Sequence, residues 1–475
     1  MSELKSRSMG RKHAIVIGGG ITGLAACYRL QREAAQRNIP LDVTLLEATA
    51  RVGGVIRTEH RDGFLLEHGP DAFLSTKPAA KALCKELGIV DQFIGTNPKV
   101  RRSFVVRNGE LHSVPEGFYL MAPGSFKPFL KSPLFSWHGK LRMAMELFIP
   151  RRGRDTDEAV AHFVRRRLGT EAFTRIAQPM IGGIYTSDAE NLSLKATFPR
   201  FLEMENTHGS IIKALRAQKK QAAETNQGTS GPRYSLFLSF KSGMQTLVDT
   251  LTEAVSKDCI KLGASVKYIQ RPDNSGWRVS LVNGAVLNSE LLCIALPALQ
   301  AGALIENVSI PLATQINAIR YASSATVNLA FRRADVTHPL DGMGFVVPAT
   351  ENLSIIGCSF SSVKFEGRSP TDHVLLRAFV GEPRSKQSES ELIELCQADL
   401  TPILGIKSTP QFTVVSKHPQ AMAQYQVGHE DVVSTVERLT SELPGFAIAG
   451  NGYHGVGIPD CIRSGETAAL SLLDS

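Results

Sequence analysis

The chain has 475 residues, of which 43% are hydrophobic and 21% charged, and its formal net charge is +8. This length exceeds one average domain, and the composition excludes extended disorder and collagen-like or whole-chain repeat architectures. No apolar run approaches the roughly 18 to 20 residues that a membrane span needs. The positive charge is compatible with three kinds of partner: nucleic acid, a membrane surface or a small acidic ligand.

The seven cysteines are scattered and form no CxxC motif. This argues against a zinc ribbon, a thioredoxin-like site and a disulfide framework, and it suits a reducing compartment. No metal site is predicted. The apolar run 14–17, which follows a polar and then basic start, is too short for a signal-peptide core. We therefore expect a cytoplasmic protein, with peripheral contact to the inner face of the cell membrane left open. The oligomeric state is also left open.

The first predicted elements surround a glycine-rich turn. Residues 14–17 indicate a buried parallel strand, and residues 24–37 indicate a helix. Between them, Gly18, Gly20 and Gly23 fit GxGxxG. Gly18 allows the tight turn, Gly20 lets a diphosphate approach the backbone, and Gly23 lets helix and strand pack closely. The helix N-terminus favours the same anion. We predict a dinucleotide site here that also includes Gly19, Ile21 and Thr22.

A second predicted strand, 42–46, ends in Glu47. A carboxylate at this place accepts hydrogen bonds from a ribose 2′-OH and disfavours a 2′-phosphate ligand. A glycine-rich turn without a ligand is the alternative. The combination of strand, helix and terminal glutamate makes that alternative the weaker one.

The rest of the chain is predicted to complete an interrupted nucleotide domain and to add two further regions. Residues 444–449 indicate a strand, 450–457 a second glycine-rich loop and 458–473 a helix. The middle of the chain indicates a helix and three strands, at 240–257, 260–269, 277–282 and 291–297. Short alternating strands within 298–417 predict a mixed sheet, and 103–204 is rich in helix formers. Residues 219–233 indicate a solvated loop.

Further motifs carry a family resemblance. Arg51 and Gly53-Gly54 resemble an extension of the dinucleotide motif in FAD enzymes of the glutathione-reductase-like and amine-oxidase-like group. More specific stretches lie at 67–74, 182–199 and 422–429. With them the chain resembles, over essentially its whole length, the oxygen-dependent FAD porphyrinogen oxidases of haem biosynthesis. Ala423 stands where members of that family usually have proline.

The resemblance implies an α/β fold with three parts. An interrupted Rossmann-like FAD-binding domain would comprise residues 11–76, 237–297 and 420–475. A mixed-sheet substrate-binding domain would comprise 77–102, 205–236 and 298–419. A helical domain that faces the membrane would comprise 103–204.

The resemblance also implies the activity and the cofactor site. Coproporphyrinogen III or protoporphyrinogen IX would lose six electrons to give the porphyrin, and molecular oxygen would be reduced to hydrogen peroxide. No catalytic acid or base is expected, since the pyrrole protons can leave without one. FAD would be held non-covalently by the glycine-rich turn and by Glu47, Ala48, Arg51, Gly54, Val55, Gly69, Pro70, Asp71, Ala72, Val266, Val456, Gly457 and Ile458.

The resemblance implies substrate contacts as well. Lys77 is the predicted anchor for a propionate, with a plain surface lysine as the alternative. Phe331 and Phe379 are candidates to flank the macrocycle, with ordinary strand core as the alternative. His68 and His454 lie in cofactor-contacting motifs, and we expect both to be positional because neither has a paired carboxylate nearby in sequence.

Three alternatives were weighed. A related amine oxidase or carotenoid desaturase would share the cofactor motifs but lack the specific stretches at 182–199 and 422–429. A protein that extracts prenylated GTPases from membranes would share the fold without redox chemistry. Nucleic acid is disfavoured as a partner, because the basic residues form short clusters without a nucleic-acid-binding motif.

Overall fold

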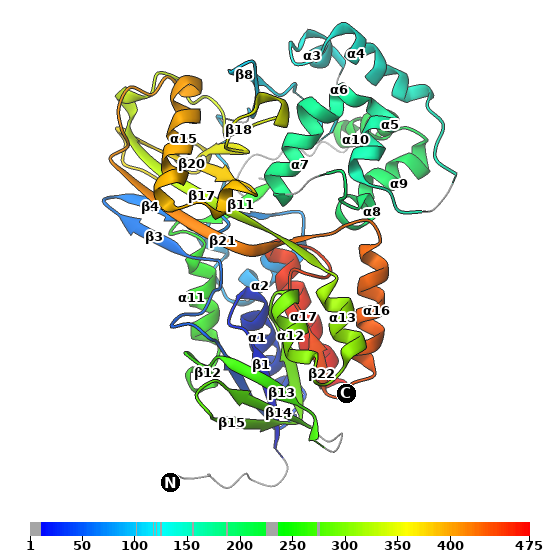
Figure 1. The fold of residues 1–475 in the computed structure, drawn as a ribbon, viewed down its shortest axis with the longest axis vertical. Helices are drawn as coiled ribbons and strands as arrows, with labels where there is room; N and C mark the ends of the chain where they lie inside the picture. The colour runs from blue at the N-terminus through cyan, green and yellow to red at the C-terminus, as the bar shows by residue number, and fades with distance from the viewer. Residues whose placement is uncertain are drawn as a thin grey trace.

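The computed structural model describes residues 11–100, 102–116, 118–119, 121–123, 126–153, 156–186, 189–224, 236–272 and 276–475. An α/β body, a mixed sheet and a group of helices make up the molecule, at the bottom, upper left and upper right of Figure 1. Most of the predicted solvated loop, residues 225–233, lies outside the described residues, as do Ser187 and Asp188 of the stretch 182–199. Among the described residues, no helix is both long and apolar enough to cross a bilayer.

A parallel sheet of five strands forms the centre of the α/β body, in the order β12-β2-β1-β16-β22. The strands are β1 (Lys12–Ile17), β2 (Leu41–Leu46), β12 (Ile260–Lys261), β16 (Leu291–Ile294) and β22 (Phe446–Ile448). β1 lies between β2 and β16, with Val16 paired to Leu45 on one side and to Cys293 on the other. Strands from three distant segments therefore form one sheet, as the α/β fold class predicted.

The alternating side chains of β1 pack into two different cores. Ala14 and Val16 join the core formed with α1 (Ile21–Gln36), α2 (Pro78–Glu86), α11 (Gln245–Ala254) and α17 (Ile458–Leu473). Ile15 and Ile17 join the core on the opposite face. That face is covered by a three-stranded antiparallel meander and three helices, namely β13 (Val266–Gln270), β14 (Trp277–Leu281), β15 (Val286–Ser289), α12 (Ala298–Ile305), α13 (Ile310–Asn317) and α16 (His429–Ser441). Burial on both faces explains the continuous apolar run of the strand.

A second sheet has seven strands in the order β21-β17-β20-β19-β18-β7-β8. Its strands are β7 (Phe104–Arg107), β8 (Glu110–Ser113), β17 (Arg320–Arg332), β18 (Gly344–Val346), β19 (Gly357–Phe360), β20 (His373–Val380) and β21 (Phe412–Gln424). The pair β7–β18 is parallel and the other pairs are antiparallel. Helix α15 (Glu389–Leu404) covers one face, and it starts with a capping box formed by Ser388 and Glu391. In Figure 1, β21 runs from this sheet down to the α/β body.

Short elements connect these layers. Strands β3 (Thr58–Arg61) and β4 (Phe64–Glu67) form a hairpin, and β5 (Phe73–Leu74), β11 (Phe237–Phe240) and β6 (Phe93–Gly95) form a small sheet. A further pair consists of β9 (Phe118–Tyr119) and β10 (Ala122–Pro123). The remaining short helices here are α14 (Ser361–Lys364), η1 (Val90–Gln92), η5 (Lys257–Cys259), η7 (Arg333–Asp335), η8 (Ala349–Glu351) and η9 (Arg384–Lys386).

The helical part has an apolar core of its own. It contains α3 (Phe126–Lys131), α4 (Trp137–Ala144), η2 (Met145–Phe148), α5 (Val160–Leu168), α6 (Thr170–Ala172), a π-helical turn (Phe173–Ala177), α7 (Gln178–Tyr185), α8 (Leu194–Thr197), α9 (Pro199–His208) and α10 (Ile211–Glu224). Arg167 and Glu146 form an ion pair at its centre, and neither side chain is exposed to solvent. Glu205 also pairs with Arg167, so the buried charges are matched.

Three predicted elements differ from the structure. Residues 219–224 of the predicted loop belong to helix α10, which continues to Glu224. The strand predicted at 260–269 is divided into β12 and β13, because the backbone between them hydrogen-bonds to the end of β2. Ala264 N donates to Glu47 O, and Gly263 N donates to Thr49 O. The helix predicted at 240–257 is shorter and spans 245–254. The domain boundaries remain predictions. Strands β7 and β8 belong to the predicted helical domain 103–204 but lie in the seven-stranded sheet. Helix α10 belongs to the predicted substrate-binding segment 205–236 but packs in the helical core.

Candidate functional site

The glycine-rich turn between β1 and α1 has the shape that a diphosphate needs. Gly18 has φ +108°, and a Cβ atom there would lie 2.5 Å from Ala295 O. A Cβ on Gly23 would lie 1.8 Å from Gly18 O, so helix and strand pack too closely for any side chain. Gly20 differs, because a Cβ there would meet no heavy atom within 4 Å. The N-terminus of α1 therefore faces open space at Gly20, and this space fits a cofactor phosphate.

Glu47 fixes the start of this turn. Its Oε2 accepts a hydrogen bond of 2.8 Å from Gly19 N, and its Oε1 accepts from the backbone and side chain of Thr49. Ala48 follows it, and Val266 begins β13 close by, since Ala264 donates to Glu47 O. The structure thus brings Glu47 and Val266 to the same end of the parallel sheet, where the ribose and adenine are predicted to bind.

Arg51 stabilises a second loop beside the turn. Its guanidinium donates to Val52 O and Ile56 O at 3.0 Å and also to Gly54 O. Gly53 N donates to Gly19 O, so this loop lies against the glycine-rich turn. Burial lowers the pKa of Arg51. The predicted contact of Arg51 with the ribose–phosphate region remains a prediction, because here the side chain holds its own loop.

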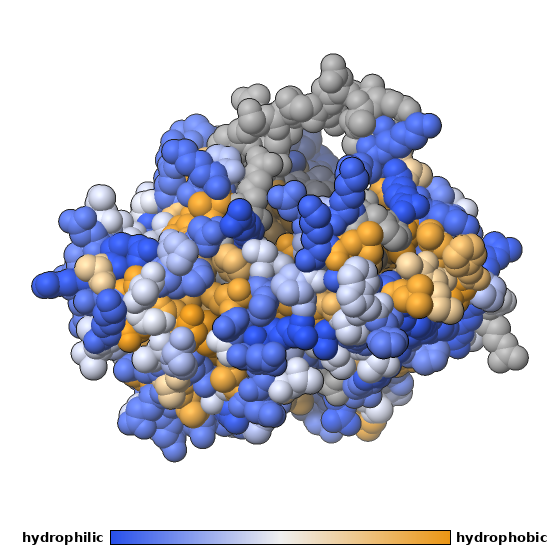
Figure 2. Space-filling view, turned by 90° about the horizontal axis from the view of Figure 1, so that it is seen from above, coloured by the Kyte–Doolittle hydropathy of each residue, from blue (hydrophilic) through white to orange (hydrophobic). Residues whose placement is uncertain are grey.

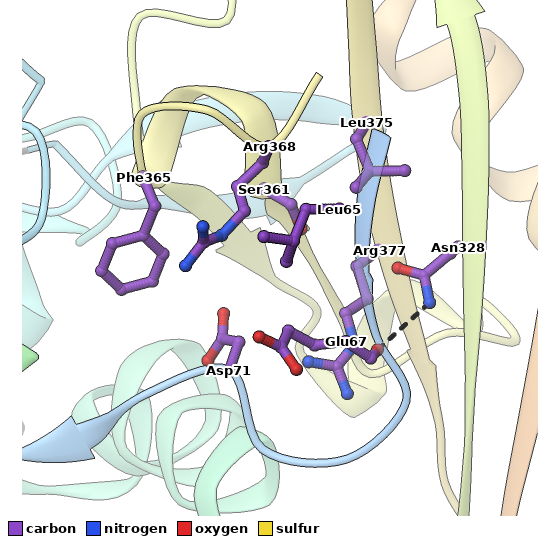
Figure 3. Close-up of a pocket in the computed structure, with 9 residues that line it drawn as sticks. All are labelled: Leu65, Glu67, Asp71, Asn328, Ser361, Phe365, Arg368, Leu375 and Arg377. Atoms are coloured by element: carbon purple, nitrogen blue, oxygen red, sulfur yellow. Dashed lines mark hydrogen bonds between the residues drawn. The ribbon is translucent and has the colours of Figure 1, made fainter. Parts of the chain in front are cut away.

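The segment Gly69-Pro70-Asp71-Ala72, predicted to contact the cofactor, is held by buried charges that the sequence analysis missed. Arg377 of β20 donates to Gly69 O. Lys364 Nζ lies 2.8 Å from Asp71 Oδ2. Figure 3 shows Glu67, Asp71, Arg368 and Arg377 converging on one small cavity. The one sequence signal for this cluster is an arginine in the middle of the otherwise apolar strand 373–380.

Burial dominates the electrostatics of this charge cluster. It raises the pKa of Glu67 to about 7, although Met244 N and Thr58 Oγ1 donate to the carboxylate. It also lowers the pKa of Arg377 and of Arg368. Burial by itself would raise the pKa of Asp71. The nearby cations Lys364 and Arg377 outweigh it and hold this pKa below the ordinary value.

The C-terminal glycine-rich loop and α17 form the other half of the site. Gly457 is the N-cap of α17, flanked by Val456 and Ile458. Asp460, whose side chain is 2% exposed, lies in the first turn and pairs with Lys77 and Arg463. Tyr425 spans the loop, because its hydroxyl donates to Asn451 O and accepts from Gly455 N, both at 2.7 Å.

Two of the specific stretches of the sequence, 182–199 and 422–429, meet around this loop. Gln424 Nε2 donates to Tyr185 O, and Ser193 N donates to Tyr425 O at 2.7 Å. Burial and the nearby Asp460 raise the pKa of Tyr185. Residues 182–199 are therefore in contact with residues 422–429, and Tyr425 connects them to the loop before α17. No local pattern in the sequence indicates these contacts.

The predicted substrate residues do not all lie together. Alternate residues of β17 and β20 point to opposite faces of the seven-stranded sheet. Phe331 points into the core beneath α15 and is 1% exposed, so a substrate has no access to its ring. Phe379 lies on the same face of the sheet as Arg377, and the guanidinium of Arg377 is 5.1 Å from the centroid of the Phe379 ring. Lys77 caps α2, and its side chain is 44% exposed even though its Nζ is paired with Asp460.

The two predicted positional histidines have carboxylate partners, contrary to the expectation from sequence. His68 Nε2 lies 2.9 Å from Glu59 Oε2, and its Nδ1 lies 2.8 Å from Ser416 Oγ. His454 Nε2 lies 2.7 Å from Glu437 Oε1. Glu59 reaches His68 through the β3–β4 hairpin, whereas Glu437 reaches His454 from helix α16.

Comparison with known proteins agrees with this geometry. The model of the family described as flavin containing amine oxidoreductase matches residues 21–473. The chain is 33% identical to the coproporphyrinogen III oxidase of Bacillus subtilis (strain 168), over 98% of this chain and 99% of the relative. It is 32% identical to that of Staphylococcus aureus (strain NCTC 8325 / PS 47), over 97% and 99%.

A solved structure from Exiguobacterium sp. 255-15, described as a protoporphyrinogen oxidase, matches with a TM-score of 0.87 and 29% identity. The match covers 98% of this chain and 100% of that one. The chain therefore belongs to the family of flavin-containing amine oxidoreductases and is an FAD-dependent oxidoreductase.

Proposed function

We propose that this chain oxidises a porphyrinogen, coproporphyrinogen III or protoporphyrinogen IX, to the porphyrin in haem biosynthesis. Molecular oxygen is the final acceptor, and hydrogen peroxide is released. The observation that carries the proposal is the contact between residues 182–199 and residues 422–429, beside the loop before α17. These stretches separate porphyrinogen oxidases from other enzymes with the same cofactor motifs. The names of the full-length relatives support the same substrate class.

The residues of this chain bind and orient rather than exchange protons. Bound FAD supplies the two-electron acceptor. The first turn of α1 at Gly20 faces the diphosphate, and Glu47 accepts from the ribose. Residues 69–72 and 456–458 face the flavin. The N-terminus of α17 stabilises negative charge on the ring. We propose no catalytic acid or base.

Lys77 is proposed to hold a substrate propionate. Its amino group is paired with the buried carboxylate of Asp460, yet nearly half of the side chain is exposed. It can therefore present hydrogen-bond donors to a second carboxylate. Phe379 lies on the sheet face that also carries Arg377, and we propose that it contacts the macrocycle.

The helical part is proposed to touch the cytoplasmic face of a membrane. Trp137, Leu141, Met145 and Phe148 are 51% to 85% exposed, and their spacing places them on one side of α4 and η2. Figure 2 looks down on this end of the molecule and shows orange apolar side chains on the helical side, among blue hydrophilic ones. Exposed apolar groups of this size gain from insertion at a bilayer interface.

Two assays test this function. Oxygen uptake, peroxide release and porphyrin fluorescence should all appear with coproporphyrinogen III or protoporphyrinogen IX, and comparing their turnover selects the substrate. Turnover of an amine without porphyrin formation would support an amine oxidase. Purified protein that takes up no FAD would support the non-redox, GTPase-extracting alternative.

The membrane contact is tested by sedimentation with anionic vesicles, which should weaken in a Trp137→Ser/Phe148→Ser variant. Equal sedimentation of both proteins would contradict the membrane contact.

A further inference from the structure

Two cysteines far apart in the sequence meet beneath the predicted cofactor site. Cys27 lies in α1 and Cys259 at the end of η5, 232 residues later, and their Sγ atoms are 3.5 Å apart. This is about the contact distance of two sulfur atoms, so a modest side-chain movement brings them within bonding distance. Both thiols are free, and their neighbourhood is the apolar core between the parallel sheet and its helices.

The two thiols differ in their surroundings. Cys27 is completely buried, whereas Cys259 is 5% exposed and lies at the edge of the core. The hydrogen bond from Cys27 is the main cause that lowers the pKa of Cys259, and Gln31 and the backbone of Leu45 act in the same direction. The same contact and burial raise the pKa of Cys27. One sulfur is therefore placed to react as a thiolate and the other to resolve the product.

We propose that Cys27 and Cys259 are a peroxide-oxidisable dithiol that forms a reversible disulfide in the folded protein. The Cys259 thiolate attacks hydrogen peroxide, the O–O bond breaks, and a sulfenic acid and hydroxide form. The Cys27 sulfur then attacks the Cys259 sulfur, and the S–O bond breaks as the S–S bond forms. Each step releases one hydroxide, and the two hydroxides take up the two thiol protons to give two waters. In sum, two thiols and one peroxide give one disulfide and two waters.

The position of this pair connects it to the nucleotide site. Cys27 lies in the helix that starts at the glycine-rich turn. Cys259 directly precedes β12, whose Lys261 accepts from Glu47 N. A disulfide between them would join the helix at the predicted diphosphate site to the segment beside Glu47, whose carboxylate is predicted to bind the ribose. Hydrogen peroxide is also the proposed product of this enzyme, although the dithiol proposal needs only the peroxide and not the porphyrinogen substrate.

The test uses the reduced holoenzyme treated with hydrogen peroxide, alkylated and digested for mass spectrometry, with flavin absorbance and circular dichroism showing that the fold persists. A Cys27–Cys259 cross-linked peptide that dithiothreitol removes is expected. Cys84→Ser is the matched control, since Cys84 is equally buried in the same core, and it should retain the cross-link.

Two further variants assign the order of events. In Cys27→Ser, oxidation should stop at a Cys259 sulfenic acid that dimedone labels. In Cys259→Ser, Cys27 should stay unlabelled. The proposal is overturned if the folded wild-type protein gives no Cys27–Cys259 peptide, or if that peptide appears only after denaturation.

Discussion

The amino group of Lys77 lies 2.5 Å from Oδ2 of Asp460, in the first turn of α17. The pair connects the chain that leaves the 69–72 segment with the helix that we propose to face the flavin. Asp460 is nearly completely buried and keeps a second cation, Arg463, at 3.2 Å. A single lysine can thus hold this helix in place while its exposed part stays accessible to the proposed substrate propionate.

Replacing Lys77 should distinguish its ion pair with Asp460 from its proposed contact with a substrate propionate. We expect Lys77→Met to raise KM for the porphyrinogen about tenfold, because a charge-assisted hydrogen bond to a propionate contributes about 1.5 kcal/mol. The flavin spectrum should stay close to that of the wild type, since Arg463 still pairs with Asp460. Lys77→Arg should recover most of the affinity. An unchanged KM together with FAD loss would restrict Lys77 to the ion pair.

Two alanine substitutions in the glycine-rich turn should affect different properties, namely FAD affinity for Gly20→Ala and stability of the fold for Gly23→Ala. Gly20→Ala places its methyl group in open space at the helix N-terminus, so the apoprotein should lose ~1 kcal/mol of stability or less. Its affinity for FAD should fall at least tenfold, as measured by titration of the apoprotein. Gly23→Ala forces a methyl group against Gly18 O and should destabilise the fold itself by about 3 kcal/mol. A Gly20→Ala protein with normal FAD affinity would show that the phosphate binds elsewhere.

Tyr425→Phe should alter the flavin site while the core packing remains. The hydroxyl holds Asn451 O and Gly455 N in the loop before α17, and losing it leaves buried polar groups unpaired at a cost of about 1–3 kcal/mol. We expect a shifted flavin absorbance and reduction potential. Tyr453→Phe is the matched control, because that buried hydroxyl has no hydrogen-bond partner in the described part of the protein. Equal spectral shifts in both variants would contradict the positioning role of Tyr425.

The buried carboxyl of Glu67 should make stability depend on pH. Burial raises its pKa from 4.5 to about 7, so between these values the folded protein binds a proton that the unfolded chain has lost. The stability contributed by Glu67 is therefore complete below pH 4.5 and is lost as the pH rises through about 7.

Glu67→Gln should remove this dependence. Relative to the wild type, its free energy of unfolding should rise by about 3 kcal/mol between about pH 5 and about pH 8, as measured by denaturant titration. Asp71→Asn is the control, because neighbouring cations lower the pKa of Asp71 from 3.8. Its carboxyl therefore stays ionised in the folded and the unfolded chain between about pH 5 and about pH 8, and the difference from the wild type should be constant there. A constant difference between Glu67→Gln and the wild type would show that this carboxyl ionises normally.

Local chemistry made the nucleotide half of the molecule predictable. The strand 14–17, the glycine-rich turn and the strand ending at Glu47 follow from burial on two faces and from backbone sterics, which act within a few residues. The helix 458–473 has the predicted bounds for the same reason. The alternation of the strand at 373–380 is likewise visible in its sequence.

The remaining features depend on contacts between distant segments. The side of the sheet to which Phe331 points is set by where α15 packs, so its prediction as a substrate residue does not agree with its buried position. The partners of His68 and Arg377 lie on other strands or loops. The pairing of β7 with β18 joins residues 104–105 to 345–346, and no local pattern indicates it.

The interleaved order of the central sheet constrains how the chain is made. β1 and β2 are synthesised first, but their neighbour β16 follows hundreds of residues later and the edge strand β22 later still. The other neighbour of this pair, β12, is also made more than 200 residues after β2, so the nascent sheet stays open on both sides during much of translation, with apolar strand edges exposed. With α17 at the flavin, as proposed, FAD can be enclosed only after residues 458–473 have been made, and we expect cofactor capture to be a late event in the biogenesis of this protein.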